Sequence, residues 1–112
     1  MLRVQGHNEP LIYNLDEVRL LVIGRSDAEA DGKLDVDLRR FSAAERGVSR
    51  RHAAITWRSG ALHVVDMGSS NGTFLNNERI KHNQPAVLHT GDTLRFGALV
   101  VEFRLVSPDE LA

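Results

Sequence analysis

The sequence predicts an all-β domain, a sandwich or a barrel built from about ten short strands. Short alternating or β-branched runs recur along the chain, turn residues separate them at close spacing, and helix-period stretches are scarce. The 112 residues suffice for one hydrophobic core but not for two. We therefore expect one domain over residues 1–106, with its functional motifs between 18 and 106, and a frayed polar tail over 107–112.

The N-terminal part of the chain contains four predicted strands. Residues 2–4 and 11–15 flank a turn that contains glycine and proline. Residues 17–24 are rich in Val, Leu and Ile, which is typical of a buried strand. Residues 34–38 alternate between apolar and acidic side chains, which predicts a half-buried strand. Between 39 and 46 we expect a loop or a single helical turn.

Turn residues define the strands of the C-terminal part. Ser59-Gly60 and Asn76-Asn77 are two-residue turn signals, so each joins the strands on either side of it. These strands are expected at 53–58 and 61–66, and at 73–75 and 79–81. Three more strands are expected at 86–88, 93–96 and 99–106, separated by glycine-containing turns.

Composition and charge exclude several classes of function. The net charge is −1, without the basic excess of a dedicated nucleic-acid binder. Cysteine is absent, which excludes disulfides and Cys-based zinc or nucleophile chemistry, and the five histidines share no metal-ligand spacing. No apolar run approaches the roughly 20 residues of a membrane span, and the N-terminus lacks a secretory h-region. We expect a cytoplasmic chain with no metal or cofactor, which binds neither nucleic acid nor membrane.

Three loops carry the residue types that bind phosphate. They are Gly24-Arg25-Ser26, residues 47–52 and residues 66–73, and each is rich in arginine or in small hydrogen-bond donors. The arginine guanidinium is a planar fork of N–H donors that matches phosphate oxygens. Serine hydroxyls and backbone N–H groups in glycine-rich turns add donors without adding charge. The loops therefore predict an anion site that needs no catalytic base.

Taken together, these loops resemble the forkhead-associated (FHA) domain family. The matching pattern is Gly24-Arg25, then Ser49-Arg50-Arg51-His52, then Asp66-x-x-Ser69-Ser70-Asn71-Gly72-Thr73. Leu75-Asn76, Gly91-Asp92 and Leu94-x-Phe96-Gly97 also match, so the resemblance covers roughly residues 11–106. It implies an FHA-like β-sandwich of two twisted, mainly antiparallel sheets, with about eleven short strands and binding loops at one end. Those loops would bind a phosphothreonine peptide.

The resemblance assigns five residues to the phosphopeptide. Arg25 would contact the phosphate, and the Ser49 hydroxyl would bind a phosphate oxygen. Arg50 would add charge and a backbone contact, and the hydroxyl or backbone of Ser70 would face the phosphothreonine. Asn71 would hydrogen-bond the main chain of the peptide.

Three further residues are assigned to structural support of the site. Gly24 and His52 are architectural in the family, and we expect His52 to brace the loops by side-chain hydrogen bonds without touching the ligand. Gly72 would allow the unusual backbone angles of its turn.

The sequence departs from the family pattern in two places. The loop over 26–48 is long and polar, and Gly47 has no side chain where some members select peptide residues. Flanking charge is then expected to matter through two groups of residues. The acidic residues Asp27, Glu29 and Asp31 would repel acidic flanks of the peptide. The basic residues Arg46 and Arg51 would attract such flanks.

Two other functions were weighed against phosphopeptide binding. In an enzyme, Ser49 and His52 would be nucleophile and base, but a spacing of three places them on opposite faces of a strand, with no carboxylate close in sequence. In an assembly or oligomerisation module, the same fold would bind partners without phosphate. Because Arg25, Ser49 and Asn71 are all present, the sequence favours a non-catalytic module in kinase-linked signalling. Its partner would be a phosphothreonine-containing protein, a Ser/Thr kinase substrate, and we expect a monomer, although self-association through a sheet face is compatible with either role.

Overall fold

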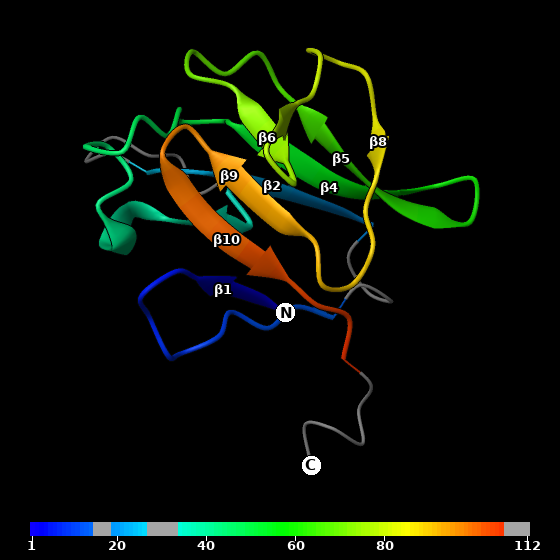
Figure 1. The fold of residues 1–112 in the computed structure, drawn as a ribbon, viewed down its shortest axis with the longest axis horizontal. Helices are drawn as coiled ribbons and strands as arrows, with labels where there is room; N and C mark the ends of the chain where they lie inside the picture. Colours follow the sequence, from blue (N-terminus) through cyan, green and yellow to red (C-terminus); the bar gives the residue numbers. More distant parts are fainter. Residues whose placement is uncertain (15–18, 27–33, 107–112) are drawn as a thin grey trace.

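The computed structural model describes residues 1–14, 19–26 and 34–106, which form two five-stranded sheets packed face to face (Figure 1). One sheet has the order β1 (Leu2–Val4), β10 (Leu99–Phe103), β9 (Thr93–Phe96), β6 (Thr73–Leu75), β7 (Glu78–Arg79). The other has the order β3 (Val36–Asp37), β2 (Leu20–Gly24), β4 (Ala53–Arg58), β5 (Ala61–Asp66), β8 (Ala86–Val87). Every described pair of strands is antiparallel except β2 with β3. The predicted β-sandwich is confirmed, with ten strands in the described residues.

One hydrophobic core fills the space between the sheets. In β5 every second residue is buried, and in β10 the buried residues are Leu99, Val101 and Phe103. This period of two is expected for a strand with one face toward the core. Phe96 of β9 and Ile23 of β2 are fully buried and bring the two sheets together in the centre.

The tight turns have the backbone angles that their sequences predict. Ser59 and Gly60 have φ of 52° and 80°, and Asn76 and Asn77 have φ of 49° and 71°. Two consecutive residues with positive φ make the turn whose twist matches a β-hairpin, and Asn and Gly tolerate it best. As a result, β4, β5 and β6 have the bounds expected from the sequence, and the bounds of β9 also agree with the prediction.

Other strands are shorter than predicted. The run 34–38 pairs with β2 only at Val36–Asp37 because acidic side chains replace part of the ladder. The backbone N–H of Val22 donates to the Asp35 carboxylate, and that of Ser26 donates to Asp37. Residues 39–46 begin with one turn of 3-10 helix, η1 (Arg39–Phe41), in agreement with the expected single turn.

The bounds of several further segments differ from the prediction as well. Leu11 forms only an isolated bridge with Leu2, so 11–14 is not a strand. The strand β7 occupies Glu78–Arg79 instead of 79–81, β8 ends at Val87, and β10 ends at Phe103 instead of continuing to 106. The expected frayed tail, 107–112, and the acidic residues Asp27, Glu29 and Asp31 lie outside the described residues.

The register of β2, β4 and β5 brings the three loops to one end of the sandwich. Ile23 pairs with Ala53, and Ala53 pairs with Asp66. Arg25 follows the end of β2, His52 precedes β4 and Met67 follows β5, so these three residues lie at the same end of the sheet. The loop after Asp66 then crosses to the other sheet, where Thr73 pairs with Phe96.

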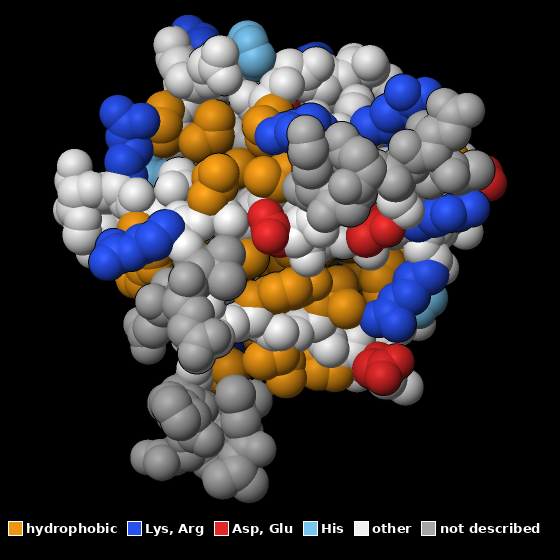
Figure 2. Space-filling model, turned by 180° about the vertical axis from the view of Figure 1, so that it is seen from behind, with side chains coloured by type: hydrophobic (Ala, Val, Ile, Leu, Met, Phe, Trp, Pro, Cys, Tyr) orange, Lys and Arg blue, Asp and Glu red, His pale blue; other side chains and the backbone are white. Residues whose placement is uncertain are grey.

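The outer face of the second sheet is partly apolar. Leu20 and Val87 are about half exposed, and alternation along β2 places Val22 on the same face as Leu20. Figure 2, which turns the molecule to show the back of Figure 1, has hydrophobic side chains across its middle and Lys and Arg side chains around them. Among the described residues no helix is long and apolar enough to cross a membrane.

Candidate functional site

Arg25 joins the first loop to the second. Its backbone N–H donates to the Ser49 carbonyl at 3.3 Å, and its side-chain Nε donates to the Val48 carbonyl at 2.6 Å. These two bonds hold the half-buried arginine against the 47–50 backbone. Within the described part of the chain, the terminal guanidinium nitrogens have no hydrogen-bond partner.

His52 joins the second loop to the third. The ring is completely buried, its Nδ1 accepts the Ser49 backbone N–H at 3.0 Å, and its Nε2 lies 2.8 Å from the Gly72 carbonyl oxygen. Because the Ser49 N–H can only donate and the Gly72 carbonyl can only accept, the ring is neutral and carries its proton on Nε2. His52 therefore fixes the distance between the two loops.

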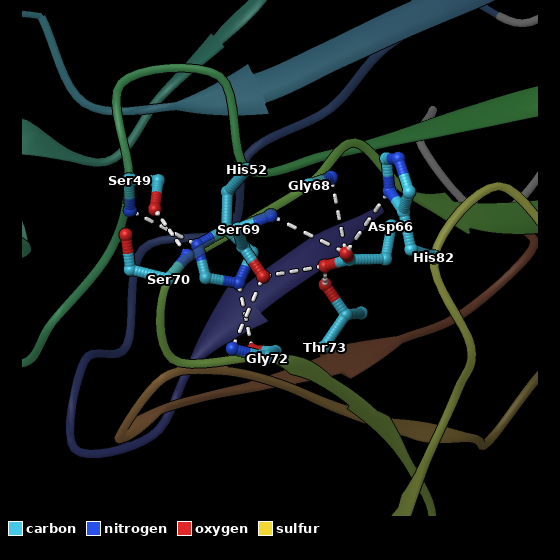
Figure 3. Close-up of polar contacts among 9 residues, drawn as sticks. All are labelled: Ser49, His52, Asp66, Gly68, Ser69, Ser70, Gly72, Thr73 and His82. Atoms are coloured by element: carbon cyan, nitrogen blue, oxygen red, sulfur yellow. Dashed lines mark hydrogen bonds and ion pairs between the residues drawn. The ribbon is translucent and has the colours of Figure 1, made fainter.

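Direct hydrogen bonds complete the connection between the second and third loops. The Ser70 backbone N–H donates to the Ser49 hydroxyl oxygen at 3.1 Å, and the Asn71 side-chain amide donates to the Gly47 carbonyl at 2.9 Å. Figure 3 shows the Ser49 and Ser70 side chains close together at one side of the loops. The Ser70 N–H is thus already used within the protein, while the Ser70 residue is exposed.

Asp66 organises the third loop from inside. Its Oδ1 accepts the hydroxyls of Ser69 and Thr73, and its Oδ2 accepts the backbone N–H groups of Gly68 and Ser69 (Figure 3). The Ser69 hydroxyl oxygen in turn accepts the Gly72 backbone N–H. We did not predict roles for Asp66 and Ser69, although an Asp three residues before a Ser in a glycine-containing loop is a turn signal.

Three glycines permit the close approach of these loops. A Cβ on Gly24 would lie 1.9 Å from the Arg50 carbonyl oxygen, so no side chain fits there. Gly72 is buried, with φ of +91°. Gly47 has φ of +79°, and a Cβ there would lie 2.6 Å from the Asn71 amide nitrogen. Gly47 therefore has a structural role that the sequence did not predict, since its carbonyl holds Asn71 in place.

Burial and hydrogen bonding shift the pKa values of the two supporting residues. Burial lowers the pKa of His52 below its usual 6.5, although the Gly72 bond and the Asp66 charge oppose this. Burial would raise the pKa of Asp66, but the hydrogen bonds from Ser69, Thr73 and Gly68 outweigh it and lower the pKa below 3.8. At neutral pH His52 is therefore uncharged and Asp66 is ionised.

The arrangement does not form a nucleophile and base. Residues 49–52 form a turn, so the expectation that Ser49 and His52 lie on opposite faces of a strand was wrong. The contact between them joins the Ser49 backbone N–H to the ring, and the other ring nitrogen is bonded to a carbonyl instead of a carboxylate. In the described part of the chain, no three His, Asp or Glu residues are grouped as metal ligands would be.

The structure places the five predicted contact residues together. Arg25 and Ser49 are half-buried, while Arg50, Ser70 and Asn71 are exposed. Hydrogen bonds join Arg25 to Val48 and Ser49, Ser49 to Ser70, and Asn71 to Gly47, while Arg50 is the next residue along the chain from Ser49. The three residues predicted to support the site, Gly24, His52 and Gly72, are buried beneath it. What each residue does with a ligand remains a prediction.

Comparison with known proteins gives relatives among regulatory proteins. The chain is 37% identical over 99 residues to an Arabidopsis thaliana protein phosphatase 1 regulatory inhibitor subunit homologue, covering 78% of the chain and 25% of that protein. It is 48% identical over 59 residues to the oxoglutarate dehydrogenase inhibitor of Corynebacterium efficiens, covering 53% of the chain and 37% of that protein. The match thus spans only 25% to 37% of the length of these relatives.

Solved structures and a family model agree with each other. A structure described as an analysis of phosphothreonine-dependent FHA domain interactions matches with a TM-score of 0.65 and 27% identity, covering 95% of both chains. The model of the FHA domain matches residues 21–97, which contain all three loops of the site. With the sandwich fold, the matching loops and these comparisons in agreement, the chain belongs to the FHA domain family.

Proposed function

We propose that this chain is a non-catalytic module that binds phosphothreonine in a partner protein. The observation that carries the proposal is the convergence of donors around the Ser49–Ser70 contact. Arg25 is bonded to Val48 and Ser49, the two serines meet at this contact, and the exposed Arg50 follows Ser49 in the chain, which supports a shared set of donors. A phosphate on a side chain carries a charge of about −1.5 to −2 at pH 7 and three acceptor oxygens, which match such a set of donors.

The rest of the site fits a ligand that continues beyond the phosphate as a peptide. The Asn71 amide uses one N–H on Gly47, and its remaining N–H and oxygen suit the C=O and N–H of a peptide main chain. Two or three charge-assisted bonds of about 1.5–3 kcal/mol each support affinity in the micromolar range. The partner is then a substrate of a Ser/Thr kinase. A regulatory role would agree with the names of the relatives, which are called regulators and inhibitors.

The proposal is tested with a library of phosphothreonine peptides with degenerate flanks and its unphosphorylated twin. Selected peptides are then measured by isothermal titration calorimetry. We expect micromolar binding of the phosphorylated form and at least a hundredfold weaker binding of the twin, since about 3 kcal/mol corresponds to more than a hundredfold. Equal binding of both forms would instead support the assembly function that needs no phosphate.

Two variants and a matched control assign the loss to the site. Arg25→Ala removes the guanidinium but also the bond to Val48, so Ser70→Ala is the cleaner second variant, because its hydroxyl has no partner among the described residues. We expect a loss of tenfold or more for Arg25→Ala and about threefold to tenfold for Ser70→Ala. Arg58→Gln, which removes an exposed arginine at the far end of β4, should change nothing. If Arg58→Gln weakens binding as much as Arg25→Ala, attraction is general and the site assignment is wrong.

A further inference from the structure

A basic pocket of about 360 Å³ lies beside the 66–73 loop, on the side away from Ser49. Its walls are the Gly68–Ser69 segment and residues 79–82. Figure 3 shows Asp66 and His82 on one side of Ser69, and Ser49 and Ser70 on the other. The basic pocket and the proposed phosphate site are therefore two sides of one loop.

The charges of the basic pocket are arranged to attract an anion. Arg79 and Lys81 are exposed, and the His82 side chain is 58% exposed. The one acidic residue in the lining, Asp66, is 5% exposed, and both of its oxygens accept hydrogen bonds from its own loop. Its Oδ2 also lies 3.8 Å from the His82 Nδ1, so the attraction of an anion rests mainly on Arg79 and Lys81. The adjacent Glu78 points to the opposite face of β7 from Arg79, because successive strand residues alternate.

The walls of the basic pocket are fixed by packing. The His82 ring lies against Gly68, where an added Cβ would be 3.2 Å from the ring Cε1. The Asn83 backbone N–H donates to the Asp66 carbonyl at 3.1 Å, which holds the 79–82 segment beside the loop. The backbone that carries the basic residues is therefore held beside the loop before a ligand arrives.

We propose that the basic pocket binds a second anionic group of the same peptide, a phosphorylated residue or an acidic side chain near the phosphothreonine. This proposal rests on the proposed function. Ser69 lines the basic pocket and Ser70 belongs to the phosphate site, so a peptide that advances about 3.3–3.6 Å per residue reaches both within a few residues. Arginine forks and lysine ammonium groups bind phosphate and carboxylate alike, which is the chemistry shared by the two sources.

The test scans a second charge along one phosphothreonine peptide. Phosphoserine, glutamate or glutamine is placed at each offset from two to five residues on either side, and binding is measured by fluorescence anisotropy. We expect affinity to rise about fivefold to twentyfold on one side only, more for phosphoserine than for glutamate. In Lys81→Gln most of this gain disappears, while the affinity of the glutamine peptide is unchanged. The matched control Arg58→Gln should keep the whole gain.

Exchanging the charges of Lys81 and of the peptide residue gives a result that non-specific attraction between protein and peptide cannot produce. With Lys81→Glu, the peptide that carries lysine at the selected offset should bind better than the one that carries glutamate. Binding of the glutamine peptide without any gain from a second anion overturns this proposal alone. Failure of every phosphothreonine peptide to bind overturns the proposed function as well. Lys81-dependent sedimentation with phosphatidylserine vesicles, in place of the peptide gain, would assign the pocket to a membrane and also overturn it.

Discussion

Replacement of Asp66 by asparagine should destabilise the whole domain. Oδ2 faces two backbone N–H groups, which cannot reverse, so the amide oxygen of the variant must take that position. The new NH2 group then faces the hydroxyls of Ser69 and Thr73, and the Ser69 oxygen already accepts the Gly72 N–H. Charge-assisted bonds of about 1.5–3 kcal/mol become neutral or are lost, so we expect about 2–4 kcal/mol less free energy of unfolding.

Urea and thermal unfolding at pH 7 measure this loss. At roughly 4–8 °C per kcal/mol for a domain of this size, a loss of about 2–4 kcal/mol should lower Tm by about 8–32 °C. The exposed pair Arg3–Glu102 provides the control, because Glu102→Gln should cost less than about 1 kcal/mol.

Hydrogen bonding lowers the pKa of Asp66 in the folded state, so its contribution is present above about pH 3.8 and is lost as the pH falls through the folded pKa. The difference between wild type and Asp66→Asn must shrink in acid. A loss under 0.5 kcal/mol at pH 7, or a difference that persists at low pH, would refute the reasoning.

Three further predictions concern the loops. Gly24→Ala should displace the 49–50 turn, because its Cβ would lie 1.9 Å from the Arg50 carbonyl oxygen. It should weaken phosphopeptide binding at least tenfold by calorimetry, while the control Arg58→Gln should not. Burial lowers the pKa of His52 below 6.5, so the unfolded chain takes up the proton first, and the free energy of unfolding should fall as the pH drops below about 6.5. In urea titrations, His52→Gln should flatten this part of the dependence of stability on pH. An unchanged slope would contradict the assignment of the buried, neutral ring. A phosphoserine twin of any bound peptide should bind about fourfold more weakly or worse if the threonine methyl is buried, at about 0.8 kcal/mol per methyl, and equal affinities would mean that the methyl is not recognised.

The strands that the sequence placed correctly are those bounded by local turn chemistry. Ser59-Gly60 and Asn76-Asn77 require positive φ at consecutive residues, and few residue types allow it, so the turns fix β4, β5 and β6. The strand at 34–38 was overestimated because its alternating acids pair with backbone N–H groups of other segments. An alternating pattern shows which side chains share a face, but it does not show that a carboxylate will replace a ladder bond.

The candidate site was predicted in part for the same reason. Arg25, Ser49 and Asn71 were identified from motif positions, and the structure brings them together. The role of Asp66 could not be derived, because its four bonds depend on how the loop folds back over the end of β5. The role of Gly47 was also missed, since only the structure shows that the Asn71 amide occupies the space of its missing side chain. The basic pocket combines residues 68–69 with 79–82, which belong to separate elements of the predicted fold.

Variants of the supporting residues and variants of the contact residues should differ in their effects on stability and affinity. The supporting residues keep the loops ordered before binding, whereas the contact residues supply hydrogen bonds to the ligand. His52 and Asp66 are buried and bonded mainly to the loops, so their removal lets the loops move in the free protein. Ordering them again would then oppose binding, at about 0.5–1.5 kcal/mol for each side chain immobilised. Ser70→Ala leaves the loops ordered and removes only a donor. Variants of the first kind should therefore lower stability and affinity together, whereas Ser70→Ala should lower affinity alone. If Ser70→Ala also lowers Tm, its hydroxyl supports the loop, and the donor set around Ser49 is smaller than proposed.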